Sequence, residues 1–499
     1  MKKSLGVLDL IGLGIGATIG SGIFALTGTA AGGQAVAEQS WLTTPLINYM
    51  FGWSLGREAA GPAVVISFLI AAIACGFAAL SYAELASMIP VSGSAYTFAY
   101  ATLGQLVAWI IGWDLILEYA IGNVAVAVSW SDYFLQFVRS GLGLRLPLWL
   151  TTDTGTALTR LAASNHTAQV LYSSLDLPQL FGHAFAINLP ALLIVALITF
   201  FLVVGAKESA IFNGIAVAIK LVVIIFFIGF GAGYVKPENW IPFAPNGWGG
   251  IMGGAAIVFF SFIGFDAISS IAEETKNPQR DLPIGMIGTL IICTCLYAAV
   301  CLILTGILPY KNYVNDAAPV ATALASIGHP WAQALVSAGA LAGMTSVLLV
   351  FQLGQPRIFM AMARDKLLPA FFARLHPRFK TPFLPTILTG VLVGVSALLI
   401  DIGQAAELTN IGTLTAFIIV CAGVIVLRKK DPHEKRAFRC PMVPLVPLLG
   451  IFSCFVLMLS LPLITWLRFF VWMAVGLTIY WFYAAPKAHR FLLSESANE

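Results

Sequence analysis

The first apolar segment of the chain, residues 8–26, constrains the fold more than any other feature. It is hydrophobic enough to enter a bilayer, yet it carries the triplet Gly20-Ser21-Gly22. Two glycines around a serine disfavour a continuous helix. A break at membrane depth leaves backbone groups that lipid cannot satisfy, so protein, water or a ligand must bond to them. Because the N-terminus of the second half-helix favours a carboxylate, the segment predicts a binding site inside the membrane.

Composition predicts an all-α integral membrane protein. Of the 499 residues, 59% are hydrophobic and 10% are charged, whereas a soluble domain carries about 25% charged residues. The net charge of +4 is too small to indicate nucleic-acid binding. The cysteines form no C-x-x-C pair and the histidines lie in loops or tails. We therefore expect no metal site, no cofactor and no enzymatic chemistry.

Apolar segments long enough to cross a bilayer, which takes about 20 residues, recur along the whole chain. We predict twelve spans, at residues 8–30, 63–89, 104–138, 187–205, 211–234, 248–272, 284–308, 331–362, 382–400, 406–428, 442–463 and 465–485. With the N-terminus inside, most lysine and arginine residues fall on one side of these spans. The positive-inside rule therefore predicts that both termini are cytoplasmic. Two long loops, about 32–62 and 139–186, then lie outside.

The sixth segment is interrupted as the first one is, over Phe259–Asp266 (FFSFIGFD). A unit of five spans must insert a second copy upside down, so interruptions in the first and sixth segments indicate two inverted five-helix repeats with a transporter site between them. The alternative is that the glycines only let helices pack closely. We predict a first repeat over 1–234, a second over 235–430, and two helices with a tail over 431–499.

Lys220 lies at the centre of the fifth apolar segment, too deep to reach water easily. Ionisable groups at this depth are costly and point to function. Because burial disfavours the ammonium form, Lys220 is a candidate proton carrier. The alternative is a fixed ammonium bonded to the free carbonyls of a broken helix, and the two roles can coexist.

Five further polar residues are candidates for gating or specificity. Asp114 and Glu118 are four residues apart, so they share one helix face. One of them either faces substrate or pairs with a basic group, or the two form a hydrogen-bonding pair within the bundle. Asp266 either caps the second half-helix of the sixth segment or belongs to an inner gate. Thr345 and Ser346 place hydroxyl groups at depth, where such residues also serve packing.

Four stretches together point to a known family. They are GATIGSGIF at 16–24, SFIGFD at 261–266 followed by AEETKNPQRDLPIG at 272–285, GQPRIFMAMARDKLLP at 354–369, and NIGTLTAFIIVCAGVIVLR at 410–428. The chain resembles the amino acid–polyamine–organocation superfamily, particularly bacterial members of its cationic amino acid transporter branch. The resemblance implies a leucine-transporter-like fold, with inverted repeats in spans one to ten and two peripheral helices.

The resemblance also assigns roles to residues at both breaks. It implies that the substrate is held by the first break through Thr18, Gly20, Ser21 and Gly22, the last three giving backbone N–H groups to the carboxylate. It implies that the amino group meets carbonyls of the second break, at Phe260, Ser261 and Ile263. Phe260 or Phe265 would close over the substrate. Lys220 matches the lysine that proton-coupled members carry where sodium-coupled relatives bind sodium.

We therefore expect a secondary active transporter that imports L-amino acids with protons across the plasma membrane (the inner membrane of the cell) by alternating access. The coupling ion is H⁺. An amino acid exchanger, a polyamine carrier and a non-transporting amino acid sensor are the alternatives. If the substrate is cationic, Asp114 or Glu118 should help to neutralise it. The loop 139–186 is longer than in many bacterial relatives, and it could cover the outer vestibule or bind an accessory protein.

Overall fold

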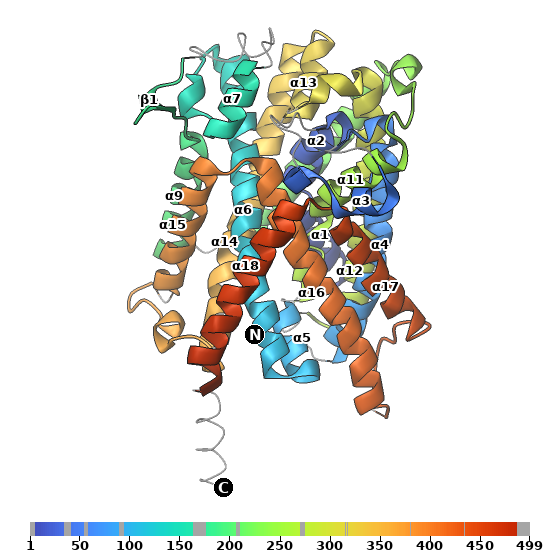
Figure 1. Ribbon diagram of the computed structural model, residues 1–499, viewed down its shortest axis with the longest axis vertical. Helices are drawn as coiled ribbons and strands as arrows, with labels where there is room; N and C mark the ends of the chain where they lie inside the picture. The colour runs from blue at the N-terminus through green and yellow to red at the C-terminus, as the bar shows by residue number, and fades with distance from the viewer. Residues whose placement is uncertain are drawn as a thin grey trace.

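The computed structural model describes residues 5–33, 41–53, 58–88, 94–162, 176–205, 210–269, 275–314, 316, 318–379, 381–433 and 435–486. Most of these residues are helical, and the long helices run along one another as a bundle (Figure 1). Within the described chain, one small antiparallel hairpin pairs β1 (Gln179–Leu180) with β2 (His183–Ala184). The hairpin lies at the upper end of Figure 1 beside α7 (Thr154–Ala162), and α13 (Pro319–Ser326) lies at the same end of the bundle.

The remaining helices follow the predicted apolar segments and the connections between them. In the first half they are α1 (Val7–Thr18), α2 (Thr27–Gly32), α3 (Leu46–Phe51), α4 (Val64–Met88), α5 (Ser94–Leu103), α6 (Gln105–Leu142), α9 (Leu189–Val204) and α10 (Ala210–Ala232). In the second half they are α11 (Gly247–Val258), α12 (Pro278–Ile307), α14 (Pro330–Arg364), α15 (Phe383–Leu399), α16 (Ile402–Lys430), α17 (Leu445–Leu459) and α18 (Leu463–Ile479).

The described helices are those of a protein with many membrane spans. Eight are long and apolar enough to cross a bilayer by themselves, and the bent pair Val7–Thr18 and Gly22–Gly32 qualifies as one further span. The apolar helices α9, α15 and α17 are shorter, at 16, 17 and 15 residues. The prediction of a helical, multi-span membrane protein is therefore confirmed.

The long connections carry structure of their own. Between α2 and α4 lie α3 and two 3-10 turns, Trp41–Thr43 and Gly61–Ala63. Between α6 and α9 lie α7 and the hairpin. Arg160 of α7 forms an ion pair of 3.4 Å with Asp132 of α6, so this connection is packed onto the end of the bundle. Parts of both predicted loops, residues 34–40, 54–57 and 163–175, lie outside the described residues.

Close helix packing brings α10, α12 and α14 around α1. A Cβ added to Gly14 of α1 would lie 2.4 Å from the hydroxyl oxygen of Thr289 on α12, and one added to Gly285 would lie 3.0 Å from Cβ of Leu10. Only glycine allows such an approach without displacing its neighbour. The first half of the interrupted helix is thereby held directly against α12.

The C-terminal end of α16 lies at the opposite end of the bundle from the hairpin (Figure 1), and there the carboxylate of Glu84, on α4, is buried. Glu84 accepts hydrogen bonds from Nε and Nη2 of Arg428, at 3.0 and 2.7 Å, and from Nε of Arg436 at 3.1 Å. The backbone N–H of Cys440 donates to the same carboxylate at 2.7 Å. These bonds fix the segment after α16 against α4.

Candidate substrate and proton-coupling site

The first apolar segment is broken where the sequence predicts. Helix α1 ends at Thr18, and the second half, Gly22–Gly32, is inclined by 46° to it. Ile19 leaves the helical region, with φ −76° and ψ 102°. The second half then begins with a π-helical turn over Gly22–Leu26. A helix that ends and another that begins inside the protein both leave backbone groups without intrahelical partners, so carbonyls and N–H groups meet at this point.

The sixth segment is interrupted by a different local structure. Helix α11 ends at Val258, a 3-10 turn follows over Phe259–Phe262, and Ile263 is extended. Gly264 has a φ of +112°, and a Cβ there would lie 2.9 Å from the backbone of Ala17 on α1. This position therefore requires glycine. Oδ1 of Asp266 accepts the N–H of Gly264 at 3.3 Å, so Asp266 caps the turn at this break.

The two breaks touch each other. A Cβ on Gly22 would lie 2.4 Å from Cα of Ser261. The hydroxyl of Tyr297, on α12, lies 2.8 Å from the carbonyl oxygen of Ser261 and 3.2 Å from that of Thr18, so its single O–H is shared between the two carbonyls. One side chain thus connects both interrupted helices. Tyr297 was not predicted as a site residue, because a lone tyrosine in an apolar segment gives no signal of its partners.

Three hydroxyl groups at the breaks are buried and lack hydrogen-bond partners among the described residues. They are the side-chain oxygens of Thr18, Ser21 and Ser261. An unsatisfied buried hydroxyl is costly, and native proteins rarely keep several together without a reason. The cluster indicates where a polar ligand would be stabilised. The structure thus brings the candidate substrate residues of both breaks together, and their role in binding stays a prediction.

Lys220 reaches the end of α1 from α10. Its side chain is fully buried, and Nζ donates to the carbonyl oxygens of Gly16 and, at 2.8 Å, of Ile19. A Cβ on Gly343 of α14 would lie 3.1 Å from Cβ of Lys220, so α14 packs closely behind the lysine. The ammonium group occupies the negative end of the α1 dipole. This geometry is what both hypotheses for Lys220, a proton carrier and a fixed tether, require.

The predicted acidic pair of α6 is buried in the bundle. Asp114 is 1% exposed and Glu118 is 3% exposed. Neither carboxylate oxygen of Asp114 has a hydrogen-bond partner among the described residues, so Asp114 does not bond to Glu118. A Cβ on Gly412 of α16 would lie 2.8 Å from Oδ1 of Asp114. Glu118 lies near both Asp114 and Asp266, so three carboxyl groups share one buried region.

The remaining candidates differ in their surroundings. The ring of Phe265 packs against Phe417 of α16 and Tyr82 of α4, with centroid distances of 5.4 and 6.2 Å. Phe260 is 5% exposed in the 3-10 turn of the sixth segment. The hydroxyl of Thr345 accepts from Nε1 of Trp130 at 3.0 Å, which makes it a contact between α14 and α6. Ser346 is buried at 1% exposure.

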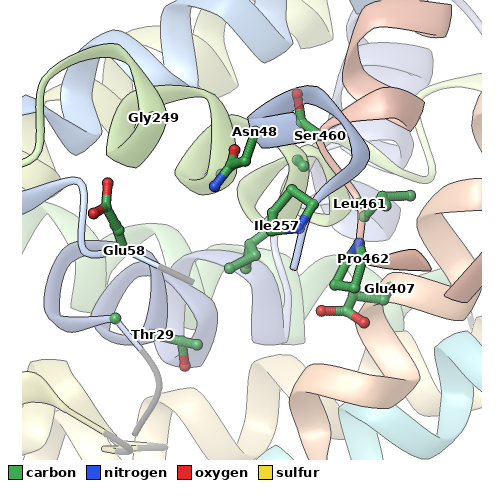
Figure 2. Close-up of a pocket in the computed structure, with 13 residues that line it drawn as sticks. Thr29, Asn48, Glu58, Gly249, Ile257, Glu407, Ser460, Leu461 and Pro462 are labelled. Carbon is green, nitrogen blue, oxygen red and sulfur yellow. The ribbon is translucent and has the colours of Figure 1, made fainter. Parts of the chain in front are cut away.

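A narrow crevice lies between the second half of the first segment and α11 (Figure 2). Thr29, Glu58, Ile257 and Glu407 are among its lining residues. Its volume of about 20 Å³ accommodates about one water molecule. An amino acid therefore cannot pass through this crevice unless the helices around it move.

Interrupted helices that meet at a buried polar centre within a multi-span helical bundle define a membrane transporter of the broken-helix class. The chain belongs to the amino acid permease family: the sequence model described as "Amino acid permease" matches residues 5–483. The superfamily resemblance is confirmed, and so is the expectation of a transporter rather than an enzyme.

Three relatives illustrate the range of the family. The chain is 46% identical over 484 residues to the branched-chain amino acid permease BcaP of Bacillus subtilis (strain 168), covering 97% of this chain and 93% of the relative. It is 43% identical over 484 residues to the methylthioribose transporter of the same organism, covering 97% and 94%. It is 37% identical over 441 residues to the vacuolar cationic amino acid transporter 4 of Arabidopsis thaliana, covering 87% of this chain and 64% of that protein.

Proposed function

We propose that this chain imports a neutral L-amino acid together with a proton across the plasma membrane, by alternating access between the two broken helices. The observation that carries the proposal is the buried ammonium group of Lys220, which bridges two carbonyls freed by the break in α1. A neutral aliphatic substrate is favoured by the branched-chain amino acid permease at 46% identity. The apolar side chains at the breaks, Val347 beside Gly20 and Ile263 in the second break, are compatible with it.

The substrate would lie where the breaks meet. Its carboxylate would accept from backbone N–H groups at Gly20–Gly22, where the second half-helix begins and its dipole favours negative charge. Its amino group would donate to carbonyls of Phe260, Ser261 and Ile263. The unsatisfied hydroxyls of Thr18, Ser21 and Ser261 add donors and acceptors within the same small volume. Tyr297 would keep the two sets of backbone groups in register through its bonds to both breaks.

Proton coupling would act through the tether. A protonated Lys220 makes charge-assisted hydrogen bonds to α1, which are about twice as strong as bonds between neutral groups. Loss of the proton toward the cytoplasm would weaken both bonds and release the first half of α1 from α10. The substrate and the proton would then leave on the same side, because the arrangement that binds the carboxylate depends on the tethered helix.

The membrane arrangement that we propose has twelve spans. It comprises the eight long helices, the bent pair and the three shorter apolar helices of the described chain. The first ten form two inverted five-helix repeats, with α17 and α18 outside them. Because the basic residues concentrate in the connections on the side of residues 357–380 and 428–439, we place that side and both termini in the cytoplasm.

The test is uptake by the purified protein in sealed liposomes, with and without an inward proton gradient. The panel contains leucine, isoleucine and valine, together with arginine, a polyamine and methylthioribose. The proposal expects gradient-driven accumulation of an aliphatic amino acid, which an uncoupler abolishes. Exchange without accumulation would make the chain an antiporter. Binding without flux would make it a sensor.

A further inference from the structure

A groove of about 590 Å³ lies on the outer surface of α12, at the end of the bundle that carries Glu84 and the end of α16. Its floor is apolar and is formed by residues that recur at helical spacing on one face of α12, namely Pro283, Ile284, Ile287, Gly288 and Ile291. Gln279 and Arg280 form one end. Ala437 and Phe438, from the segment between α16 and α17, form the remaining wall.

The wall opposite α12 is held in place by the carboxylate of Glu84. Arg436 and Cys440, on either side of Ala437 and Phe438, both donate to that carboxylate. The backbone N–H of Phe438 also donates to the hydroxyl of Ser87 on α4, at 3.4 Å. The groove is therefore a feature built by the fold, and its width does not depend on a free loop.

The depth of the groove follows from the length of α12. A helix of 30 residues is about 45 Å long, whereas the hydrocarbon core of a bilayer is about 30 Å thick. If α12 is centred in the membrane, about five residues at each end lie among the headgroups. Arg280 then lies at headgroup level, and Ile284, Ile287 and Ile291 lie along the hydrocarbon.

Exposed basic side chains flank the headgroup end of the groove. Arg280 is exposed, and it forms no ion pair or side-chain hydrogen bond within the described part of the chain. Lys276, Lys435 and Arg439, close to it in sequence or on the segment that walls the groove, are exposed as well. The acid in the same turn, Asp281, is 6% exposed and does not line the groove.

We propose that this groove binds an anionic glycerophospholipid of the inner leaflet. The phosphate would pair with the guanidinium of Arg280, since arginine recognises phosphate through two parallel hydrogen bonds. One acyl chain would lie along Ile284, Ile287 and Ile291. Gly288 lines the groove and also packs against Ile11 of α1, where an added Cβ would be 3.0 Å from Cδ1. The lipid would therefore lie against α12 beside the point where α12 contacts α1.

The test uses native mass spectrometry of the purified, delipidated full-length protein in detergent. Dioleoylphosphatidylglycerol and dioleoylphosphatidylcholine are titrated separately. We expect one anionic lipid to bind more tightly than the zwitterionic one. Arg280→Gln should weaken binding of the anionic lipid about fivefold, the change expected for one basic contact near a charged lipid surface. Ile287→Trp, which fills the groove, should weaken binding of both lipids.

The matched control is Lys430→Gln, which removes the same charge at the same end of the bundle from a residue outside the groove. It should bind the anionic lipid as the unmodified protein does. Equal binding of the two lipids, or equal losses in Arg280→Gln and Lys430→Gln, would overturn the proposal. If inorganic phosphate displaces the lipid, the ligand of the groove is a soluble anion and the lipid proposal is wrong. If the unmodified protein forms a dimer that is absent in Ile287→Trp, the groove is occupied by a second copy of the chain and the lipid proposal is wrong. Melting temperatures establish that each variant is folded.

Discussion

Replacing Lys220 with methionine removes the charge of the buried tether and keeps most of its volume. In the structure, this change deletes two hydrogen bonds from an ammonium group to the carbonyls of Gly16 and Ile19. Hydrogen bonds to charged groups contribute about 1.5–3 kcal/mol each. Their joint loss of about 3–6 kcal/mol would shift the equilibrium between the tethered and released arrangements of α1 by about two to four orders of magnitude.

The assay compares two kinds of transport by the same liposomes. Accumulation against a gradient requires the protein to take up and release a proton. Counterflow of labelled substrate requires only that the substrate site open alternately to the two sides of the membrane. We expect Lys220→Met to lose accumulation driven by a pH gradient and to keep part of its counterflow. Lys236→Met, which replaces an exposed lysine, is the control and should behave as the unmodified protein.

One result would refute this reasoning directly. If Lys220→Met still concentrates substrate under a pH gradient, and an uncoupler still abolishes that accumulation, the proton is carried by another group. If the variant loses counterflow as well but still binds substrate, Lys220 is a fixed tether that the moving helix cannot do without. Substrate-dependent shifts of the melting temperature measure the binding separately from the transport.

Three further changes test the architecture of the site. Gly264→Ala introduces a Cβ at a φ of +112° and 2.9 Å from the backbone of Ala17. The protein should lose about 2 kcal/mol or more of stability, which a lowered melting temperature would show. Gly253→Ala in α11 has no atom within 4 Å of its Cβ, so its melting temperature should stay unchanged. Tyr297→Phe removes the hydroxyl that bonds to the carbonyls of Thr18 and Ser261. The contact between the two breaks should weaken by about 1–3 kcal/mol, and uptake should fall. Tyr49→Phe removes a hydroxyl that bonds to the carbonyl of Trp41 near the surface, and this control should leave uptake unchanged. Glu84→Gln removes the buried carboxylate charge that pairs with Arg428 and Arg436. Breaking a buried ion pair costs about 3–5 kcal/mol, so we expect a lower denaturation midpoint, and a midpoint equal to that of the exposed-site control Asp431→Asn would contradict the importance of the network.

The membrane class and the breaks were predictable because they depend on local chemistry. A long apolar segment cannot remain in water, and the Gly20-Ser21-Gly22 triplet cannot propagate a helix as alanine or leucine would. The same reasoning identified Lys220, because a charge in an apolar segment is conspicuous without any knowledge of its neighbours. The expected roles of Lys220 and of the residues at the breaks remain predictions, whereas their proximity to one another is a property of the structure.

The partners of these residues were beyond local reasoning. Tyr297 has the same hydrophobic character whether it bonds to two broken helices or to none. The sequence was also as compatible with a hydrogen-bonded Asp114 as with the carboxylate that has no hydrogen-bond partner in the described part of the chain. The groove on α12 depends on a segment more than 140 residues away in sequence, which Glu84 holds in place. The sequence by itself determined the apolar spans, the breaks and the buried charge, since each follows from the hydration and conformational preference of nearby residues. Only the tertiary structure decided which carbonyl, hydroxyl or carboxylate meets which, because those contacts join helices that are distant along the chain.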